Sequence, residues 1–416
     1  MADNKKLFDE RLKRVDDALA LKEPDRVPCI PMYTTFPFLW AGYTMAEVLY
    51  DQTKAQDAIK RYLAHFEPDM DAGYGAAFAG MGPVLEKFDP VWLEWAGKPN
   101  SRIPDNSIHQ YLEKAYMEDG EYEEFNTDMS GWITRRYLPR STNSLKALAG
   151  VDVRGGTGYG FGALSMQFAS PEVQQAYKTL GEVGQMAGAY YGQLAADLAE
   201  TTEMGYPNQT AATITTAFDC VSDCLRGTLP ASLDMMADPD SLKAAIEQFH
   251  PVTLASGIGQ AAYSTGRFVF IPLHKGMDGF MSDEQYRTFY WDTLLRLVNG
   301  LIDAGLTPWI YGEGHYDSRI ECLMDTPKGK CWIHLQDTDM ARAKKLLGDV
   351  ACLSGGFRSD VLARGTVEQT IEQVKQNMDI LAPGGGYIFD LSDAMDDCKP
   401  ENVEAMFETV KEYGKY

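Results

Sequence analysis

The sequence predicts an α/β fold built from repeated βα units, and three observations support this prediction. In the second half of the chain, short apolar runs that end in polar residues alternate with helical segments, which is typical of a parallel sheet or barrel. The 416 residues, 45% of them hydrophobic, can bury a large core. Because neither a low-complexity tract nor a linker marks a boundary, we predict a single domain over residues 1–416.

The first half of the chain has fewer regular signals. A charged amphipathic helix is expected at the N-terminus, followed by strands at 27–32 and 69–74. Residues 84–140 are rich in Pro, Trp and charge, so we expect an accessory insertion that packs over the main fold without a core of its own. A long helix is predicted over 170–200.

The second half contains strand and helix signals in regular alternation. The apolar runs that predict strands are 268–273, 308–311, 331–335, 350–353 and 387–389. Capping boxes, in which a Ser or Thr is followed three residues later by Gln, predict helix starts at Ser282 and Thr366. Gly305 is expected to end the first of these helices, and further helices are predicted over 339–347 and from Pro400 onward.

Composition and charge exclude several classes of partner. Sixty acidic against 38 basic residues give a formal net charge of −22, which repels phosphate backbones over a Debye length of roughly 8 Å. No run approaches the ~18 apolar residues of a membrane span, and the N-terminus lacks a signal-peptide apolar region. The seven scattered cysteines are expected to be reduced thiols. We therefore predict a cytoplasmic protein without nucleic-acid or membrane partners.

Polar residues stand where the later strands are predicted to end. In a parallel barrel the βα loops converge around one mouth, so these side chains are candidates for chemistry. The candidates are His274, Glu313 with His315, His334 with Asp337, and Asp390. We interpret His274, Asp337 and Asp390 as catalytic candidates and His315 as a substrate-binding candidate.

Each candidate has a structural alternative that the sequence leaves open. His274 could be a hydrogen-bonded loop histidine, Glu313 could be an anion held by Lys275, and Asp337 could be a helix cap. His334 lies within an apolar strand, so it points either into the barrel, where it needs a partner, or into the helix layer.

A glutamate and a histidine from adjacent strands form part of a zinc site. Zn²⁺ accepts carboxylate oxygen and imidazole nitrogen, and it can leave one position open for substrate, so Glu313 and His334 are predicted metal ligands. Cys220 and Cys224 lie four residues apart, but without a second pair nearby they are better interpreted as buried apolar residues.

Three stretches of the chain carry a family resemblance. They are Glu23-Pro24-Asp25-Arg26-Val27-Pro28, Leu225-Arg226-Gly227 through Pro239, and Gly384-Gly385-Gly386-Tyr387-Ile388 through Pro400-Glu401-Asn402. With these stretches the chain resembles the uroporphyrinogen decarboxylase superfamily from end to end. The resemblance implies a distorted (β/α)8 TIM barrel, here with an N-terminal helix and the insertion, and an open cleft at its C-terminal face.

The stretch after the first strand departs from the decarboxylases themselves. Those enzymes carry an arginine-rich Met-Arg-Gln-Ala-Gly-Arg stretch there, because the four acidic side chains of a porphyrinogen need cationic partners. Residues 33–40 of this chain contain no arginine. They include Tyr33, Phe36 and Trp40, which we expect to shape a pocket for a flat, weakly charged substrate.

Within the superfamily, the chain is similar to corrinoid-dependent methyltransferases of the O-demethylase type. These move the methyl group of a methoxylated aromatic compound to a corrinoid protein, and their zinc pattern is Glu-x14-Glu-x20-His. Glu313 and His334 reproduce the second spacing, with 20 residues between them, whereas Val298 stands at the first glutamate. His274 and Asp337 are the local candidates for the third ligand.

The resemblance therefore implies a zinc-assisted methyltransferase. Zn²⁺ would polarise the ether oxygen, and cobalamin on a corrinoid protein would receive the methyl group at the barrel mouth. Two alternatives are a decarboxylase like the uroporphyrinogen enzyme and a non-catalytic corrinoid- or tetrapyrrole-binding protein. Whether the barrel forms a homodimer is left open.

Overall fold

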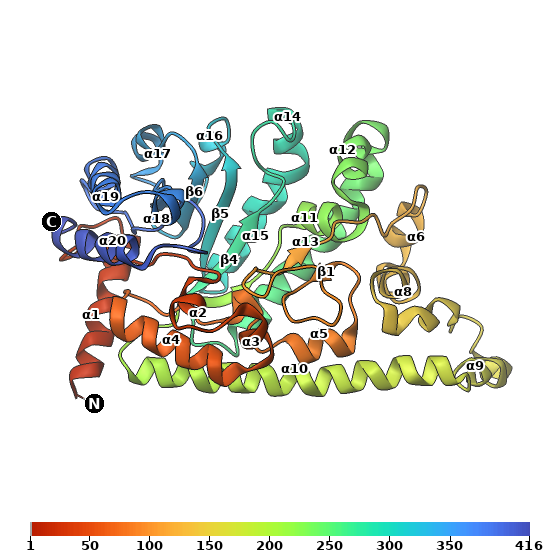
Figure 1. Ribbon diagram of the computed structural model, residues 1–416. Helices are drawn as coiled ribbons and strands as arrows, with labels where there is room; N and C mark the ends of the chain where they lie inside the picture. The colour runs from red at the N-terminus through yellow and green to blue at the C-terminus, as the bar shows by residue number, and fades with distance from the viewer. Residues whose placement is uncertain (1) are drawn as a thin grey trace.

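Five parallel strands form the continuous part of the sheet and follow one another in chain order. The computed structural model describes residues 2–416. The strands are β3 (Thr210–Thr213), β4 (Phe268–Leu273), β5 (Thr307–His315), β6 (Trp332–Asp337) and β7 (Cys352–Gly355). Leu273 lies beside Gly312, Gly312 beside Leu335, and Leu335 beside Gly355. The C-terminal ends of β4 to β7 are therefore level, and the residues after them gather at one edge (Figure 1).

Short extended segments continue the sheet on the side of β7. Residues 387–391 lie parallel to β7, and residues 27–33 lie parallel to 387–391 through a bridge between Cys29 and Phe389. The Phe389 carbonyl accepts a hydrogen bond from Ile30, at 3.0 Å. The first predicted strand thus pairs with the last one, as closure of a barrel requires.

A third short segment completes the ring on the side of β3. The amide of Asp69 donates to the carbonyl of Cys29 at 2.9 Å, and Asp71 is bridged in parallel to Asn208, just before β3. The five strands and the three short segments thus form a closed ring of eight parallel segments, in which each pairs with its two neighbours. This ring confirms the (β/α)8 barrel. Three of the eight pair over only a few residues, so the barrel is irregular there.

Aromatic side chains fill the lower interior of the barrel. Phe268, Trp309 and Trp332 belong to one buried cluster with Ile388, and α1 (Ala2–Leu19) adds Val15, Ala18 and Leu19 to it. The rings of Trp309 and Trp332 stack with centroids 4.3 Å apart. Because alternate residues of a strand point the same way, His334 points into the barrel, one layer above Trp332.

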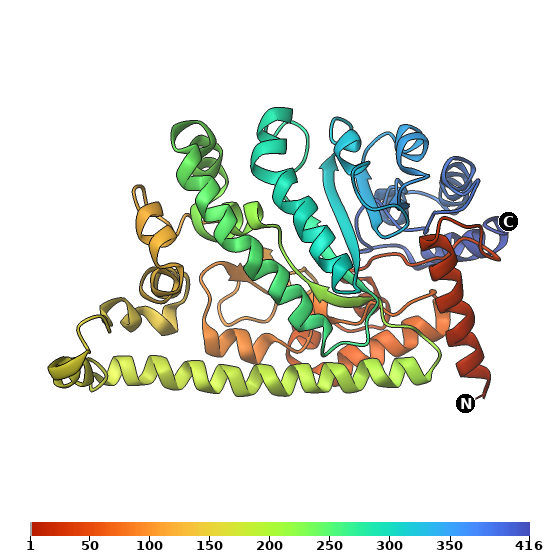
Figure 2. The same cartoon turned by 180° about the vertical axis from the view of Figure 1, so that it is seen from behind.

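Helices surround the second half of the barrel. They are α11 (Ala217–Val221), α12 (Thr228–Ala237), α13 (Pro239–Ala261), α14 (Asp283–Gln285), α15 (Asp292–Asp303), α16 (Ile320–Leu323), α17 (Met340–Leu347), α18 (Asp360–Arg364), α19 (Val367–Leu381) and α20 (Pro400–Tyr413). Figure 2 shows α13 and α15 side by side on the back of the barrel. Both predicted capping boxes are confirmed, at Ser282 with Gln285 and at Thr366 with Gln369.

The first half of the chain forms the lower front and one side of the molecule. Its elements are α2 (Phe36–Trp40), α3 (Met45–Tyr50), α4 (Gln52–Phe66), α5 (Gly82–Phe88), β1 (Leu93–Glu94), β2 (Gln110–Tyr111), α6 (Tyr122–Thr127), α7 (Met129–Trp132), α8 (Leu138–Ser141), α9 (Phe161–Gln167) and α10 (Pro171–Glu203). Within the segment 84–140, α6 packs against α13 of the barrel. Tighter or wider helical turns occur at η1 (Gly75–Ala77), η2 (Ile133–Tyr137), η3 (Asn143–Gly150), η4 (Gly158–Gly160), η5 (Ser222–Arg226) and η6 (Tyr286–Trp291).

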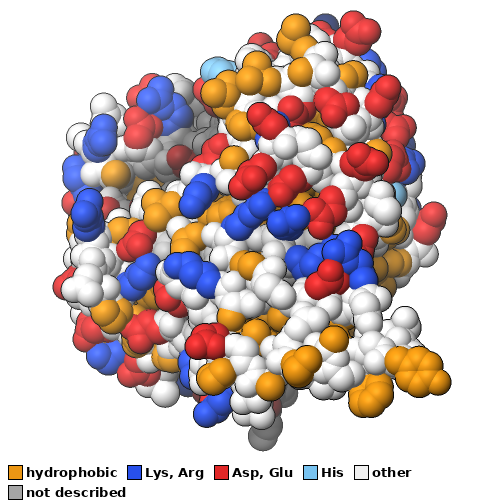
Figure 3. Space-filling model, turned by 90° about the vertical axis from the view of Figure 1, so that its right-hand side faces the viewer, with side chains coloured by type: hydrophobic (Ala, Val, Ile, Leu, Met, Phe, Trp, Pro, Cys, Tyr) orange, Lys and Arg blue, Asp and Glu red, His pale blue; other side chains and the backbone are white. Residues whose placement is uncertain are grey.

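The 33-residue helix α10 runs along the base of the molecule and carries α9 at its far end (Figure 1). Tyr159, Phe161 and Met166 near that end are exposed, and hydrophobic side chains protrude at the lower edge of the face shown in Figure 3. None of the helices within residues 2–416 combines the length and the apolar character needed to cross a membrane.

Candidate active site

Five charged or ionisable side chains meet at the C-terminal ends of three consecutive strands. We name Asp219, Asp223, His274, Lys275 and Glu313 the mouth cluster. His274 and Lys275 follow β4 directly, and Glu313 lies near the end of β5. The two aspartates come from α11 and η5, which follow β3. The parallel sheet brings these groups together because their strands are neighbours.

His274 is the centre of the mouth cluster. Its Nδ1 lies 2.5 Å from Oδ2 of Asp223, and its Nε2 lies 3.9 Å from Oε1 of Glu313. Burial alone would lower the pKa of His274, but the hydrogen bond with Asp223 and the negative charges of Asp219 and Glu313 outweigh it and raise the pKa to about 9. The ring is therefore an imidazolium at neutral pH. Its Nδ1–H donates to Asp223, and its Nε2–H lies on the side of the ring that faces Glu313.

The carboxylates around this imidazolium differ in their proton affinity. Burial raises the pKa of Glu313, and the nearby charges of His274 and Lys275 only partly offset it. Asp223 is half-buried, yet its hydrogen bond to His274 and the charges of His274 and Lys275 hold its pKa below the ordinary value. Lys275 Nζ lies 3.2 Å from Asp223 Oδ1. Asp223 thus stays ionised as the partner of His274, whereas Glu313 binds a proton more readily.

Asp219 lies beneath the turn that carries His274. Its side chain is completely buried, and it accepts hydrogen bonds from the backbone amides of His274 and Lys275 and from the hydroxyl of Tyr290. Burial, together with the charge of Asp223, raises the pKa of Asp219 to about 6. Asp219 and Asp223 were not among the residues predicted from the sequence, and Lys275 was considered there only as an ion partner of Glu313.

A second group of polar side chains lies deeper in the barrel. We name Tyr311, His334, Ser354 and Asp390 the inner cluster. Nδ1 of His334 lies 3.0 Å from Oγ of Ser354 and 3.2 Å from Oδ2 of Asp390, and Nε2 lies 3.0 Å from the carbonyl oxygen of Ser392. The ring stacks on Tyr311 at 4.1 Å and is fully buried. His334 is therefore a satisfied core histidine in this arrangement.

These contacts decide whether Glu313 and His334 fit a zinc ion. A carbonyl oxygen only accepts, so Nε2 of His334 carries a hydrogen, and its Nδ1 is taken by Ser354 and Asp390. Neither ring nitrogen has a lone pair left for a metal. Within residues 2–416, no group of three or more His, Cys, Asp or Glu side chains is arranged to hold a metal ion. The residues do not fit zinc as they lie, and zinc itself stays a prediction.

Asp390 also joins the inner cluster to the first strand. Its Oδ1 accepts hydrogen bonds from the amides of Met32 and Leu391, both at 2.8 Å. The carboxylate is fully buried, and it connects β6 with the two short segments that close the barrel. Asp390 therefore stabilises the closure of the barrel, while its predicted catalytic role stays a prediction.

His315 and Asp337 form an ion pair at the outer rim. The two side chains end β5 and β6, and Nε2 of His315 lies 3.1 Å from Oδ2 of Asp337. Both are well exposed, at 63% and 69%. Solvent competes with such a pair, so it adds little to stability. The predicted roles of His315 in substrate binding and of Asp337 in catalysis stay predictions.

The three aromatic residues predicted to bind substrate pack against α4. Tyr33 is buried, donates its hydroxyl to the carbonyl of Gly73 and packs edge-on against Tyr62. Phe36 and Trp40 both contact Phe66 of α4, with ring centroids 5.7 and 5.2 Å apart. The structure thus brings these residues together with one another, inside the α2–α4 interface, and their role in binding stays untested.

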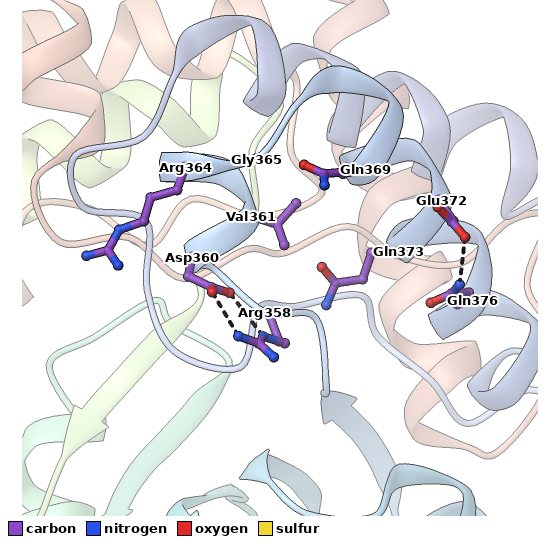
Figure 4. Close-up of a pocket in the computed structure, with 9 residues that line it drawn as sticks. All are labelled: Arg358, Asp360, Val361, Arg364, Gly365, Gln369, Glu372, Gln373 and Gln376. Atoms are coloured by element: carbon purple, nitrogen blue, oxygen red, sulfur yellow. Dashed lines mark hydrogen bonds and ion pairs between the residues drawn. The ribbon is translucent and has the colours of Figure 1, made fainter.

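A surface depression lies apart from both clusters. Figure 4 shows this depression of about 540 Å³ between α18 and α19. It is lined by Arg358, Asp360, Val361, Arg364, Gly365, Gln369, Glu372, Gln373 and Gln376. Arg358 is paired with its neighbour Asp360 in this lining, and no side chain of the mouth or inner cluster takes part.

Comparisons with known proteins agree with the barrel. Residues 205–413, half of the chain, match the family model described as Uroporphyrinogen decarboxylase (URO-D). A methyltransferase from Methanosarcina mazei superposes with a TM-score of 0.60 at 12% identity, covering 96% of this chain and 98% of that chain. A B12-independent methionine synthase from Shewanella sp. W3-18-1, in complex with selenomethionine, gives a TM-score of 0.36 at 10% identity over 52% and 63% of the two chains. No curated protein matches. The Methanosarcina likeness shows the fold alone.

Proposed function

The chain belongs to the uroporphyrinogen decarboxylase (URO-D) family, and from this premise we propose that it is a methyltransferase acting on a methoxylated, aromatic small molecule. The methyl acceptor in this proposal is a corrinoid carried by a partner protein. The fold shared with a Methanosarcina mazei methyltransferase supports the reaction class. The single observation that carries the mechanism is the imidazolium of His274, held between Asp223 and Glu313 at the barrel mouth.

An ether releases its methyl group only when its oxygen is stabilised as the C–O bond breaks, because an unprotonated alkoxide or phenoxide leaves poorly. The reduced corrinoid supplies the electron pair that takes the methyl group. His274 donates its Nε2 proton to the ether oxygen, which keeps the electrons of the C–O bond and leaves as a phenol. Asp223 stabilises the ring while it is charged.

Glu313 is suited to return the proton to His274. Its side chain is 40% exposed, and its Oε1 lies 3.9 Å from Nε2 of His274. Burial raises its pKa, so it can carry a proton from solvent to the imidazole after each turnover. A carboxyl group with the ordinary pKa would bind that proton more weakly.

The charge of the mouth cluster favours a neutral donor. The partly exposed members of the cluster are the carboxyl groups of Asp223 and Glu313 and the cations of His274 and Lys275, while Asp219 is completely buried beneath them. A polyanionic porphyrinogen would find no excess of positive charge here, whereas an uncharged aryl ether needs none. This balance supports methyl transfer over the decarboxylase alternative.

The test is methyl transfer measured without oxygen. Wild-type protein, a reduced corrinoid and a panel of methoxylated aromatics are incubated, and the released phenol and the methylated corrinoid are quantified. We expect His274→Gln to lower kcat by about 10²–10⁴-fold, the range for a lost general acid. His250→Gln, the same change on α13 outside both clusters, is the matched control and should keep wild-type activity.

Two outcomes would overturn the proposal. One is that His274→Gln, shown to be folded by circular dichroism, transfers methyl groups at the wild-type rate. The other is that none of the methoxylated compounds reacts while uroporphyrinogen loses carbon dioxide under the same conditions, which would establish the decarboxylase alternative. Corrinoid binding without turnover of either substrate class would instead favour a binding protein.

A further inference from the structure

The turn after β4 is held by buried groups at every residue. The carbonyl of Leu273 accepts a hydrogen bond from the hydroxyl of Tyr316 at 3.2 Å. The amides of His274 and Lys275 donate to Asp219 at 3.2 and 3.1 Å. The carbonyl of Gly276 accepts from Nε of Arg319, also at 3.2 Å.

Asp219 is itself fixed in this arrangement. Its amide donates to Oγ1 of Thr216, the residue that caps α11, at 3.1 Å. The hydroxyl of Tyr290, which is fully buried in η6, donates to Oδ2 of Asp219 at 2.5 Å. The carboxylate therefore joins the helix after β3, the turn after β4 and the helix after that turn.

The space around the turn is closed as well. A Cβ added at Gly276 would lie 2.5 Å from the hydroxyl of Tyr316 and 3.1 Å from the ring of Tyr290. Only glycine fits there without moving these side chains. Tyr290 and Tyr316 thus limit the space around Gly276.

A carboxylate is the group that this position needs. It only accepts hydrogen bonds, so its two oxygens can take two backbone amides and one hydroxyl together. An asparagine of the same shape would present an NH₂ group to at least one of these donors. Burying a carboxylate costs free energy, and three hydrogen bonds offset that cost only if all three donors are in place.

We propose that Asp219, oriented by Tyr290, is the positioning residue for His274: it fixes the turn so that Nδ1 meets Asp223 and Nε2 faces the mouth. Asp219 is completely buried, and its side chain accepts hydrogen bonds from the backbone of the turn and from Tyr290. It acts through the backbone of the residue that carries the acid. The kinetic part of this inference rests on the proposed methyl transfer, whereas the position of the ring can be measured without any substrate.

The first experiment observes the ring directly. In protein labelled with ¹⁵N-histidine, the Nδ1 proton of His274 gives a downfield signal because of its short hydrogen bond to Asp223, and the signal is assigned by its loss in His274→Gln. We expect this signal to shift or disappear in Asp219→Asn. Asp71→Asn is the matched control, because Asp71 is also a buried carboxylate that accepts a backbone amide and a hydroxyl, from Gly73 and Thr201.

The second experiment separates rate from binding. Because Asp219 does not contact the donor, Asp219→Asn should lower kcat by about 10²-fold, as a displacement near 1 Å can do, with KM within about twofold of wild type. Tyr290→Phe removes only one of the three bonds and should lower kcat by a few-fold. Asp219→Glu keeps an acceptor and should restore more activity than Asp219→Asn.

The outcomes distinguish this inference from the proposed function. An unchanged His274 signal in folded Asp219→Asn overturns the positioning role, whatever the reaction is. An unchanged kcat in that variant overturns its catalytic consequence. If no methoxylated donor is turned over by the wild type, the proposed function fails, and the ring signal alone decides the role of Asp219.

Discussion

His274 links the chemistry of the mouth to the pH dependence of stability. Its folded-state pKa of about 9 lies above the ordinary value of about 6.5, because its proton is held by Asp223 and the neighbouring carboxylates. The stabilisation by this proton is complete below pH 6.5 and is lost as the pH rises to 9. We therefore expect the Tm of the wild type to fall more between pH 6.5 and 9 than that of His274→Gln.

Thermal unfolding at pH 6.5, 7.5 and 9 tests this prediction. The effect should be modest, because the His274 side chain is 36% exposed and solvent screens the cluster. Parallel loss of Tm in both proteins over this range would mean that His274 is not protonated above its ordinary pKa.

His334 gives a prediction on stability and metal content. His334→Ala removes the ring hydrogen bonds with Ser354 and the Ser392 carbonyl and the charge partner of Asp390 Oδ2, and it opens a buried cavity, so we expect a loss of about 3 kcal/mol or more in the free energy of unfolding. Because both ring nitrogens are engaged, we also expect the purified wild type to hold much less than one zinc per chain.

Urea unfolding and elemental analysis provide the two measurements. Ser354→Ala is the milder comparison, since it opens no large cavity; it removes two neutral hydrogen bonds, with His334 and from Nε1 of Trp332, and should cost about 2 kcal/mol. One zinc per chain in the wild type, lost in His334→Ala, would show that the ring leaves these partners to bind metal.

At the scale of elements, α10 contains four glycines at positions where the structure leaves room for a side chain. Gly181, Gly184, Gly188 and Gly192 lie within the helix, and a Cβ added at any of them meets no atom within 4 Å. Glycine inside a helix costs about 0.5–1 kcal/mol relative to alanine. Gly184→Ala should therefore stabilise the protein by about that amount.

Denaturant unfolding measures this gain, with Gly355→Ala as the contrast. Gly355 has a φ of 102°, and a Cβ there would lie 2.1 Å from the carbonyl oxygen of Leu335, so that variant should be destabilised. A loss of stability in Gly184→Ala that grows at high protein concentration would instead mean that a second chain approaches this face.

The same scale explains which parts of the fold could be predicted. Strands β4, β5 and β6 were found because each is a run of apolar residues before a polar one, and the helices at Ser282 and Thr366 because their capping boxes are local. Strand β3 reads Thr-Ala-Ala-Thr, too short and too weakly apolar to mark a strand end. Asp219 and Asp223, which follow it, were missed for that reason.

The direction of His334 could not be predicted because it depends on the closed barrel. A strand alternates its faces, but only the register with the neighbouring strands decides which face is inside. The partners of His334 come from β7 and the last short strand, which are distant in sequence. The predicted zinc pair relied on spacing along the chain, and spacing does not report how many contacts a side chain already has.

At the scale of the whole molecule, Asp69 fastens the closure of the barrel. It is fully buried, forms ion pairs with Arg14 and Arg26 at 2.6 and 2.8 Å, and accepts the amide of Cys29. Removing one member of a buried ion pair costs about 3–5 kcal/mol because a charge is left without its partner; here that charge is Arg26, while Arg14 keeps its pair with Asp25. We expect Asp69→Ala to lower the free energy of unfolding by that amount.

Chemical denaturation followed by fluorescence and by circular dichroism tests the prediction. Asp9→Ala serves as the control, because Asp9 forms an exposed pair with Lys5 and its loss should change stability by less than about 0.5 kcal/mol. If Asp69→Ala unfolds like the wild type, the first strand is held by its packing and not by this carboxylate.

The turn at 273–276 has a consequence for crystallography with bound compounds. Buried side chains hold each of its residues, whereas Glu313 opposite is held by none of them and is partly open to solvent. Soaked crystals should therefore superpose on the ligand-free form at this turn and differ at Glu313. Variant libraries designed for a different methyl donor can then change the side chains that face this turn and keep residues 273–276 constant.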